Sequence, residues 1–390
     1  MTRFRTPRIA ALAALALAAS VLPAITTAGP AVASPKPKPS PSPSPSPSPS
    51  PSSSPPPAAS FRSLGQMPGS AMGTDVSGVS GDGSTIAGYG WICDTFNANG
   101  SCLSSGTVQA FRWTPAGGYQ TLGTPGTSAF FGAGAVSYDG SVIVGEHPPE
   151  NGYSAFRWTA ATGMVQLPIN IAAAVTPDGG MVAGGDNWWM TTGQAGTFGL
   201  FPGFSNQTEA YGLAGTAQAP VAVGGAIGGS GAFGPVDHAF RWTPATGLQD
   251  LGVLSGGESF ATAISADEKV IVGEARVSGG FWHAFRWTAA TGMVDLGTLG
   301  GPESGALAVN GDGSVIVGSS LTSGSTGSDI AFRWTAKTGM QDLTKLVNAP
   351  QNLLVQSAVG VSQDGTVITG NGRNLKLGID EPWRAVLPLP

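Results

Sequence analysis

Apolar and polar positions follow one short pattern that returns along most of the chain. Residues 238–252 have the sequence HAFRWTPATGLQDLG. The pattern recurs almost unchanged at residues 283–297 and 331–343, and more loosely at 110–123 and 155–167. The aromatic and β-branched residues of AFRWT and the alternation of LQDLG are typical of strands, and Pro-Ala-Thr-Gly is typical of a turn. Each copy is therefore predicted to be a β-hairpin.

The turn of this hairpin sets a predicted register. If the turn holds four residues and ends in glycine, the repeating arginine faces an aspartate on the returning strand in three of the five copies, and Thr121 or Gln166 in the two looser ones. The predicted pairs are Arg241 with Asp250, Arg286 with Asp295, and Arg333 with Asp342. Opposite charges across a strand pair contribute about 0.2–1 kcal/mol, so a structural role is favoured over a ligand-binding row of arginines. Phe240 and Trp242 alternate with Arg241 and are expected in the core.

A second pattern, an Asp-Gly turn followed by an apolar run, has the same spacing. It occurs at residues 82–88, 139–145, 178–184, 312–318 and 364–370, and with Asp-Glu in place of Asp-Gly at 267–273. A variant at 219–225 fills the one gap. A short strand such as residues 261–265 precedes each Asp-Gly turn, which favours another hairpin. Each period then holds four strands and occurs seven times. The fold class is predicted as all-β, a seven-bladed β-propeller of four-stranded repeats.

Two AFRWT copies are expected to be degenerate. The spacing of the others places one near residues 197–201 (TFGLF), and the last at residues 383–387 (WRAVL). The first strand predicted for the propeller, at residues 61–65 (FRSLG), is of the LQDLG type. The strands then make seven complete sets, and the sequence leaves open whether one closing blade combines strands from both ends.

The longer pattern resembles a known family. Residues 238–257 with 260–273, and 283–301 with 305–318, are similar to the HAF-type extracellular repeat of bacterial secreted proteins. The resemblance covers essentially all of residues 61–388. It implies a secreted, propeller-shaped repeat protein, and it brings no established activity and no catalytic residues.

The N-terminal part predicts export and a spacer. Residues 1–33 resemble a signal peptide, with three early arginines, an apolar run and an Ala-Val-Ala cleavage site. An uncleaved membrane anchor is disfavoured because the run is short and Pro23 interrupts it. Residues 34–60 are a Pro/Ser-rich disordered linker, whose Pro/Ser segment at residues 35–57 is roughly 70 Å long if extended. It acts either as a stalk or as a spacer without a role. Residues 61–390 form the propeller.

Composition narrows the possible partners. Charged residues make up 11% of the chain and the net charge is −5, which argues against nucleic acid. No cofactor motif, metal-ligand cluster or catalytic motif occurs in the sequence. Cys93 and Cys102 are expected to form a disulfide in an oxidising compartment, worth roughly 2–3 kcal/mol. We expect a secreted monomer with no transmembrane segment once the signal is removed.

Large aromatic residues in the long loops of one rim are the candidate ligand-binding residues: Trp91, Tyr153, Trp188, Trp189 and Trp282. They either stack on a ligand or pack beneath their own loops, and the sequence leaves both open. The favoured function is a secreted non-catalytic interaction module for a polysaccharide or a cell-surface protein. The alternative is a secreted propeller hydrolase or lyase acting on an extracellular polysaccharide, which paired carboxylates at the channel mouth would favour.

Overall fold

The computed structural model describes residues 59–93, 95, 107–123, 132–147, 154–200, 207–231, 234–324 and 328–388. The chain divides into two compact units, residues 1–55 and 56–390, and every described residue belongs to the second. The predicted signal peptide lies outside the described residues, as does the predicted linker apart from its last two residues. No helix in the described ranges is long and apolar enough to cross a membrane.

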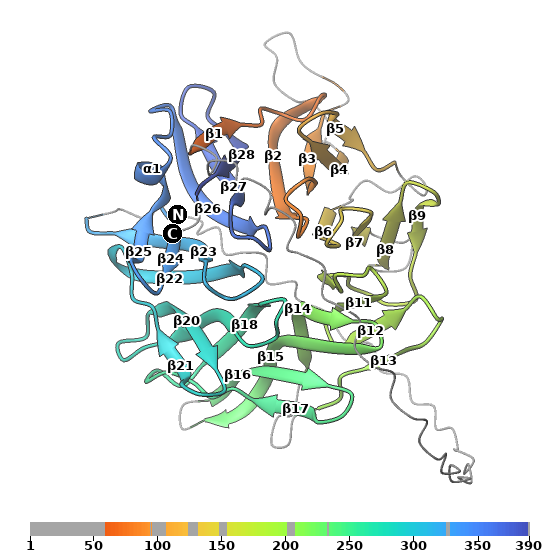
Figure 1. Ribbon diagram of the computed structural model, residues 1–390, viewed down its shortest axis with the longest axis vertical. Helices are drawn as coiled ribbons and strands as arrows, with labels where there is room; N and C mark the ends of the chain where they lie inside the picture. The colour runs from red at the N-terminus through yellow and green to blue at the C-terminus, as the bar shows by residue number, and fades with distance from the viewer. Residues whose placement is uncertain are drawn as a thin grey trace, which may run out of the picture. The chain divides into compact units, whose positions relative to one another are not determined.

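The described chain forms a seven-bladed β-propeller, as predicted (Figure 1). Blade 1 holds β2 (Ser70–Val79), β3 (Ile86–Ile92), β4 (Thr107–Thr114) and β5 (Gly118–Thr121). Blade 2 holds β6 (Gly132–Val136), β7 (Val142–His147), β8 (Ser154–Thr159) and β9 (Gly163–Gln166). Blade 3 holds β10 (Ala174–Val175), β11 (Met181–Gly184), β12 (Asn187–Met190) and β13 (Ala195–Thr197).

The later blades repeat this order. Blade 4 holds β14 (Thr208–Thr216), β15 (Ala219–Gly231), β16 (Gly234–Thr243) and β17 (Gly247–Asp250). Blade 5 holds β18 (Ser259–Ile264), β19 (Ile271–Arg276), β20 (Trp282–Thr288) and β21 (Gly292–Asp295). Blade 6 holds β22 (Gly300–Val309), β23 (Ile316–Thr322), β24 (Ile330–Thr335) and β25 (Gly339–Asp342), followed by the short helix α1 (Leu343–Leu346).

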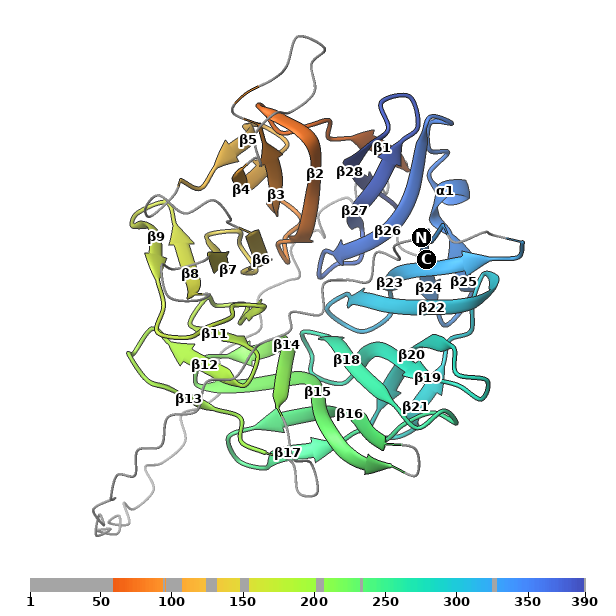
Figure 2. The same cartoon turned by 180° about the vertical axis from the view of Figure 1, so that it is seen from behind.

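Blade 7 combines both ends of the described chain. Its strands β26 (Leu353–Val361), β27 (Val367–Asn374) and β28 (Ile379–Val386) are completed by β1 (Ser60–Ser63), which pairs antiparallel with β28. Figures 1 and 2 both show β1 beside β28. A single parallel bridge between Gly73 and Asp380 also joins blades 7 and 1. The N-terminal strand therefore closes the ring, which answers the question that the sequence left open.

The apolar core lies between adjacent blades. One cluster joins Val223 and Ala239 of blade 4 to Ile271 and Phe285 of blade 5, all four fully buried. The phenylalanine of the AFRWT strand is fully buried in five blades, at positions 111, 156, 240, 285 and 332. The predicted core positions of this strand are thus confirmed for phenylalanine, and Trp242 is buried beside Phe240.

The predicted hairpin register is wrong by one residue. Thr243 pairs with Gly247, so Arg241 lies opposite Gln249 and Asp250 lies opposite Phe240. The reason is that the turn glycine, in the left-handed conformation (φ 66° at Gly247), is itself the first paired residue of the returning strand. The turn thus has three residues instead of four. The other two predicted pairs fail in the same way: Arg286 lies opposite Val294 and Asp295 opposite Phe285, while Arg333 lies opposite Gln341 and Asp342 opposite Phe332.

These arginines and aspartates have other partners. His238 Nδ1 lies 2.9 Å from the carboxylate of Asp250. Asp295 makes the same 2.9 Å contact with the Nδ1 atom of His283, and Asp342 accepts a hydrogen bond from the backbone N–H of Thr344 at the start of α1. Two of the arginines reach other strands: Arg241 pairs with Glu268 of blade 5 at 3.7 Å, and Arg333 donates to the carbonyl of Pro388.

The degenerate AFRWT copy of blade 3 is β12, not residues 197–201. Trp189 lies opposite Val182 and so occupies the tryptophan position of the pattern, and Trp188 occupies the arginine position. The expected copy at residues 383–387 is confirmed, because Trp383 in β28 lies opposite Gly370 just as Phe332 lies opposite Gly318.

Candidate functional site

The two ends of the blades differ in chemistry. Consecutive antiparallel strands place alternate connections at opposite ends. One end, here called the turn face, carries the Asp-Gly turns and the three-residue turns. The other end, here called the loop face, carries the connections that follow the second and fourth strands of each blade. This division is the one expected from the repeat pattern.

On the turn face the aspartates accept hydrogen bonds from residues of their own turns. Asp267 accepts hydrogen bonds from the hydroxyl of Ser265 at 2.6 Å and from the backbone N–H of Lys269 at 3.1 Å. Burial works to raise the pKa of Asp267, but these hydrogen bonds outweigh it and lower the pKa. Hydrogen bonding gives the same net lowering of the pKa at Asp82, Asp139, Asp178, Asp312 and Asp364.

Neighbouring turns are also bonded to one another. Backbone hydrogen bonds of 2.8–3.0 Å run from Gln363 to Gly81, Asp82 to Tyr138, Tyr138 to Pro177, Asp267 to Gly311, and Gly311 to Gln363. Between blades 3 and 4, the carboxylate of Asp178 accepts from the N–H of Ala217 at 3.1 Å. The Arg241–Glu268 ion pair links blades 4 and 5. The turn face is therefore a continuous ring of interlocked turns.

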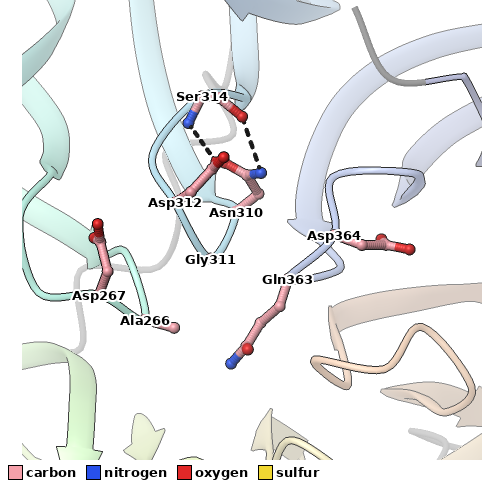
Figure 3. Close-up of a pocket in the computed structure, with 8 residues that line it drawn as sticks. All are labelled: Ala266, Asp267, Asn310, Gly311, Asp312, Ser314, Gln363 and Asp364. Atoms are coloured by element: carbon pink, nitrogen blue, oxygen red, sulfur yellow. Dashed lines mark hydrogen bonds between the residues drawn. The ribbon is translucent and has the colours of Figure 1, made fainter. Parts of the chain in front are cut away.

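A depression of about 680 Å³ lies among the turns of blades 5, 6 and 7 (Figure 3). Its lining includes Asn310, Asp312 and Ser314, which are hydrogen-bonded to one another. Gln363 extends toward its opening. The aspartates that line this depression accept hydrogen bonds within their own turns, so a structural role accounts for them without a ligand.

On the loop face, blade 5 holds an organised aromatic cluster. The ring of Trp282 lies 5.6 Å from that of Phe260, centroid to centroid, and the guanidinium of Arg276 lies 5.0 Å from the Trp282 ring. Arg276 is fixed in turn by a 2.6 Å ion pair with Glu258. The adjacent Phe281 is 45% exposed. We call Phe260, Arg276, Phe281 and Trp282 the blade 5 platform.

The other predicted aromatic residues do not join this platform. Trp91 lies near the end of β3 in blade 1 and is 36% exposed. Trp188 and Trp189 belong to β12 and not to a long loop, and each packs against the core on one side of blade 3. Tyr153 lies outside the described residues. The four described candidates lie in blades 1, 3 and 5, and the expected loop position is wrong for the two tryptophans of β12.

Of the four platform residues, only Trp282 was among the candidates named from the sequence. Phe260 lies in the innermost strand, at a position held by Glu209 in blade 4 and Gly305 in blade 6. An alignment of the seven repeats marks it as an unusual aromatic residue. Arg276 is the last residue of the second strand, β19, and could have been found in the same way.

Cys93 is buried at the end of blade 1's second strand, with 7% of its surface exposed. Its sulfur lies 3.0 Å from the carbonyl oxygen of Thr95. Cys102 lies outside the described residues, so the disulfide stays a prediction.

Two carboxyls in strands near the loop face have raised pKa values. Burial, and then the charge of Asp380, raise the pKa of Asp75 to about 6. Burial alone raises the pKa of Glu146 to about 7. The pKa values of the turn-face aspartates are lowered, so the two groups of carboxyls differ in the direction of the shift. Within the described ranges, no group of three or more acidic, histidine or cysteine side chains could hold a metal ion.

The raised pKa of Glu146 predicts a pH-dependent stability. Between about pH 4.5 and 7 the unfolded chain loses this proton while the folded chain keeps it, so Glu146 lowers stability progressively as the pH rises through that window. Glu146→Gln should therefore be about 1–3 kcal/mol more stable than wild type at pH 8 and nearly equal to it at pH 4.

Urea denaturation at both pH values measures the difference. As a control, Asp139→Asn should lose stability at pH 8, because hydrogen bonds hold that carboxyl ionised. Equal stability of Glu146→Gln and wild type at pH 8 would contradict the prediction.

Comparisons with known proteins were made for the whole chain. No family model and no curated protein matches it. Among solved structures it is similar to TolB from Acinetobacter baumannii, with 13% identity and a TM-score of 0.41 over 72% of this chain and 76% of that one. It is also similar to the β-propeller domain of the trilobed protease from Pyrococcus furiosus, with 9% identity and a TM-score of 0.47 over 80% of this chain and 95% of that one. The tricorn protease is similar with 12% identity and a TM-score of 0.47 over 86% of this chain and 34% of that one. These likenesses concern the fold and carry no argument about activity.

Proposed function

We propose that this chain is a secreted, non-catalytic interaction module that binds an extracellular polysaccharide on its loop face. The blade 5 platform carries the proposal. Phe281 presents an exposed aromatic surface, and contacts with Phe260 and Arg276 already fix the neighbouring Trp282 ring. A ring fixed before binding loses little conformational entropy when a ligand stacks on it. Amphipathic aromatic rings and charged hydrogen-bonding groups are together suited to sugars.

Secretion rests on the N-terminal sequence. The basic, apolar and small-residue segments of residues 1–33 support export, and the Pro/Ser-rich residues 34–60 would hold the propeller away from its point of attachment. The resemblance to the HAF-type repeat agrees with this location.

A glycan array and polysaccharide pull-down with the full chain test the proposal. We expect Phe281→Ala and Trp282→Ala to weaken polysaccharide binding by about 10- to 100-fold, as loss of an interface anchor does. Tyr138→Ala is the matched control, since Tyr138 has the same 45% exposure but lies on the turn face. It should bind like wild type.

The exposed Phe281 makes the test independent of folding, because its truncation removes little buried surface. Unchanged binding in Phe281→Ala, or no bound polysaccharide with wild type, would overturn the proposal. Capture of a protein alone would favour the cell-surface-protein alternative.

A hydrolase or lyase acting on an extracellular polysaccharide is the second candidate. The raised pKa values of Asp75 and Glu146 favour it, since a carboxyl that stays protonated near neutral pH can act as a general acid. New reducing ends or unsaturated sugars in the same binding reactions would support this candidate, and intact polymer would count against it.

A further inference from the structure

The strand that closes the ring carries an unusual pair of like charges. In the register of β1 with β28, Arg62 lies directly opposite Arg384. Directly opposed residues have Cβ atoms about 4.5–5.5 Å apart, and like charges at that spacing destabilise a sheet. Burial, and then the charge of Arg62, lower the pKa of Arg384.

The other blades avoid this pairing. The arginine of the AFRWT strand lies opposite an uncharged residue in five blades: Gln120, Val165, Gln249, Val294 and Gln341. Only the strand contributed by the N-terminal end places a second arginine there, among the blades that the structure describes. The repeat itself therefore does not require Arg62.

The two guanidiniums also lack a carboxylate. In the described part of the chain neither Arg62 nor Arg384 forms an ion pair. The Nε atom of Arg384 is buried without a hydrogen-bond partner, as are those of Arg112 and Arg333 at the same repeat position, so the second arginine is what sets the seam apart. The guanidinium of Arg62 lies 5.6 Å from the Trp113 ring centroid of blade 1, which restricts its position. Arg62 is exposed and Arg384 is half-buried, so a ligand reaches the pair from the Arg62 side.

We propose that Arg62 and Arg384 form a binding site for a sulfate or phosphate group at the seam where the propeller closes. Guanidinium forks match the oxygens of such groups in bidentate geometry. A bound sulfate ion, with two negative charges, neutralises both guanidiniums, and a sulfate ester, with one, neutralises half of their charge. Either reduces the repulsion across the seam and so couples ligand binding to ring closure. This site is separate from the blade 5 platform and does not depend on the proposed polysaccharide binding.

Thermal unfolding of the full chain in sodium sulfate and in sodium chloride of matched ionic strength tests the site. Sulfate stabilises proteins generally by exclusion from their surface, so the informative quantity is the difference between wild type and Arg62→Gln, which carries the glutamine found in other blades. At ten times the dissociation constant, sulfate should raise the Tm of wild type by about 2–4 °C more than that of Arg62→Gln. Arg62→Lys, which keeps the charge without the fork, should show a smaller excess than wild type.

A sulfated oligosaccharide and its desulfated form, compared in the same assay, distinguish the source of the group. An excess Tm shift with inorganic sulfate assigns the site to the free ion. A shift with the sulfated oligosaccharide alone, lost in Arg62→Gln, assigns it to a polymer-borne sulfate. Equal shifts in wild type and Arg62→Gln with both ligands would overturn the proposal.

Discussion

Gly273→Ala is expected to destabilise the propeller by about 3–5 kcal/mol. A Cβ at Gly273 would lie 1.9 Å from the carbonyl oxygen of Phe260 and 2.9 Å from the Cα of Ala261. Both atoms belong to the backbone of the adjacent strand β18, so no side-chain rotation relieves the overlap. Either β18 or β19 has to move, and each packs between two blades.

Urea denaturation followed by circular dichroism measures this loss. Gly78→Ala in β2 is the matched control, because a Cβ there meets nothing within 4 Å and its φ is not positive. It should change stability by less than about 1 kcal/mol in either direction. A Gly273→Ala variant as stable as Gly78→Ala would show that the two strands separate more easily than the structure implies.

The same close approach recurs around the ring. At the matching glycines of six blades, a Cβ would lie 1.8–2.1 Å from a backbone carbonyl oxygen of the first strand: Gly88, Gly145, Gly224, Gly273, Gly318 and Gly370. In each blade a register shift in the first strand follows within two residues. The final glycine of the DGSVIVG pattern is therefore required by this irregular strand pairing, in addition to marking the repeat.

The architecture could be predicted because each repeat encodes all four strands locally. Alternation, the Asp-Gly turn and the AFRWT strand each depend on residues close in sequence, and their sevenfold recurrence leaves few folds. The hairpin register could not be fixed in the same way. A glycine in the left-handed conformation serves equally as the last turn residue or the first paired residue, and the choice moves every arginine of the repeat by one position.

The spacing between repeats predicted strand positions wrongly where the loops differ in length. The second and third strands are joined by residues 93–106 in blade 1 but only by residues 185–186 in blade 3. Surface loops tolerate such changes at little thermodynamic cost. The spacing of the other AFRWT copies therefore predicted the wrong position for the copy in blade 3, which is the NWWM strand β12. The Asp-Gly turn of blade 3, by contrast, could be identified from its own residues at 178–184, without counting along the chain.

The blade 5 platform was only partly predictable, since its members come from different strands. Trp282 was expected on this face, whereas the contribution of Phe260 depends on which way the innermost strand turns its side chain. The charge pair at the seam depends on the ring closing with β1. Once that closure is known, Arg62 follows from aligning β1 with the fourth strands of the other blades.

Phe285→Ala is expected to cost about 3–5 kcal/mol, the usual loss for a fully buried phenylalanine. The Phe285 ring has no exposed surface and belongs to the cluster that joins blades 4 and 5. Its truncation leaves a cavity at a blade interface, where backbone hydrogen bonds on both sides limit collapse. The loss should appear as a lower urea midpoint with an unchanged m-value, because the closed ring unfolds as one unit.

Phe281→Ala, four residues earlier and 45% exposed, is the control and should change stability by less than about 0.5 kcal/mol. A second transition in the Phe285→Ala variant would contradict unfolding as one unit and indicate that blades 4 and 5 separate first. A cost near 1 kcal/mol with one transition would instead mean that the neighbouring blades close the cavity. The ring would then be more adaptable than its interlocked turns imply, and the same adaptability would weaken the case for a rigid binding platform on blade 5.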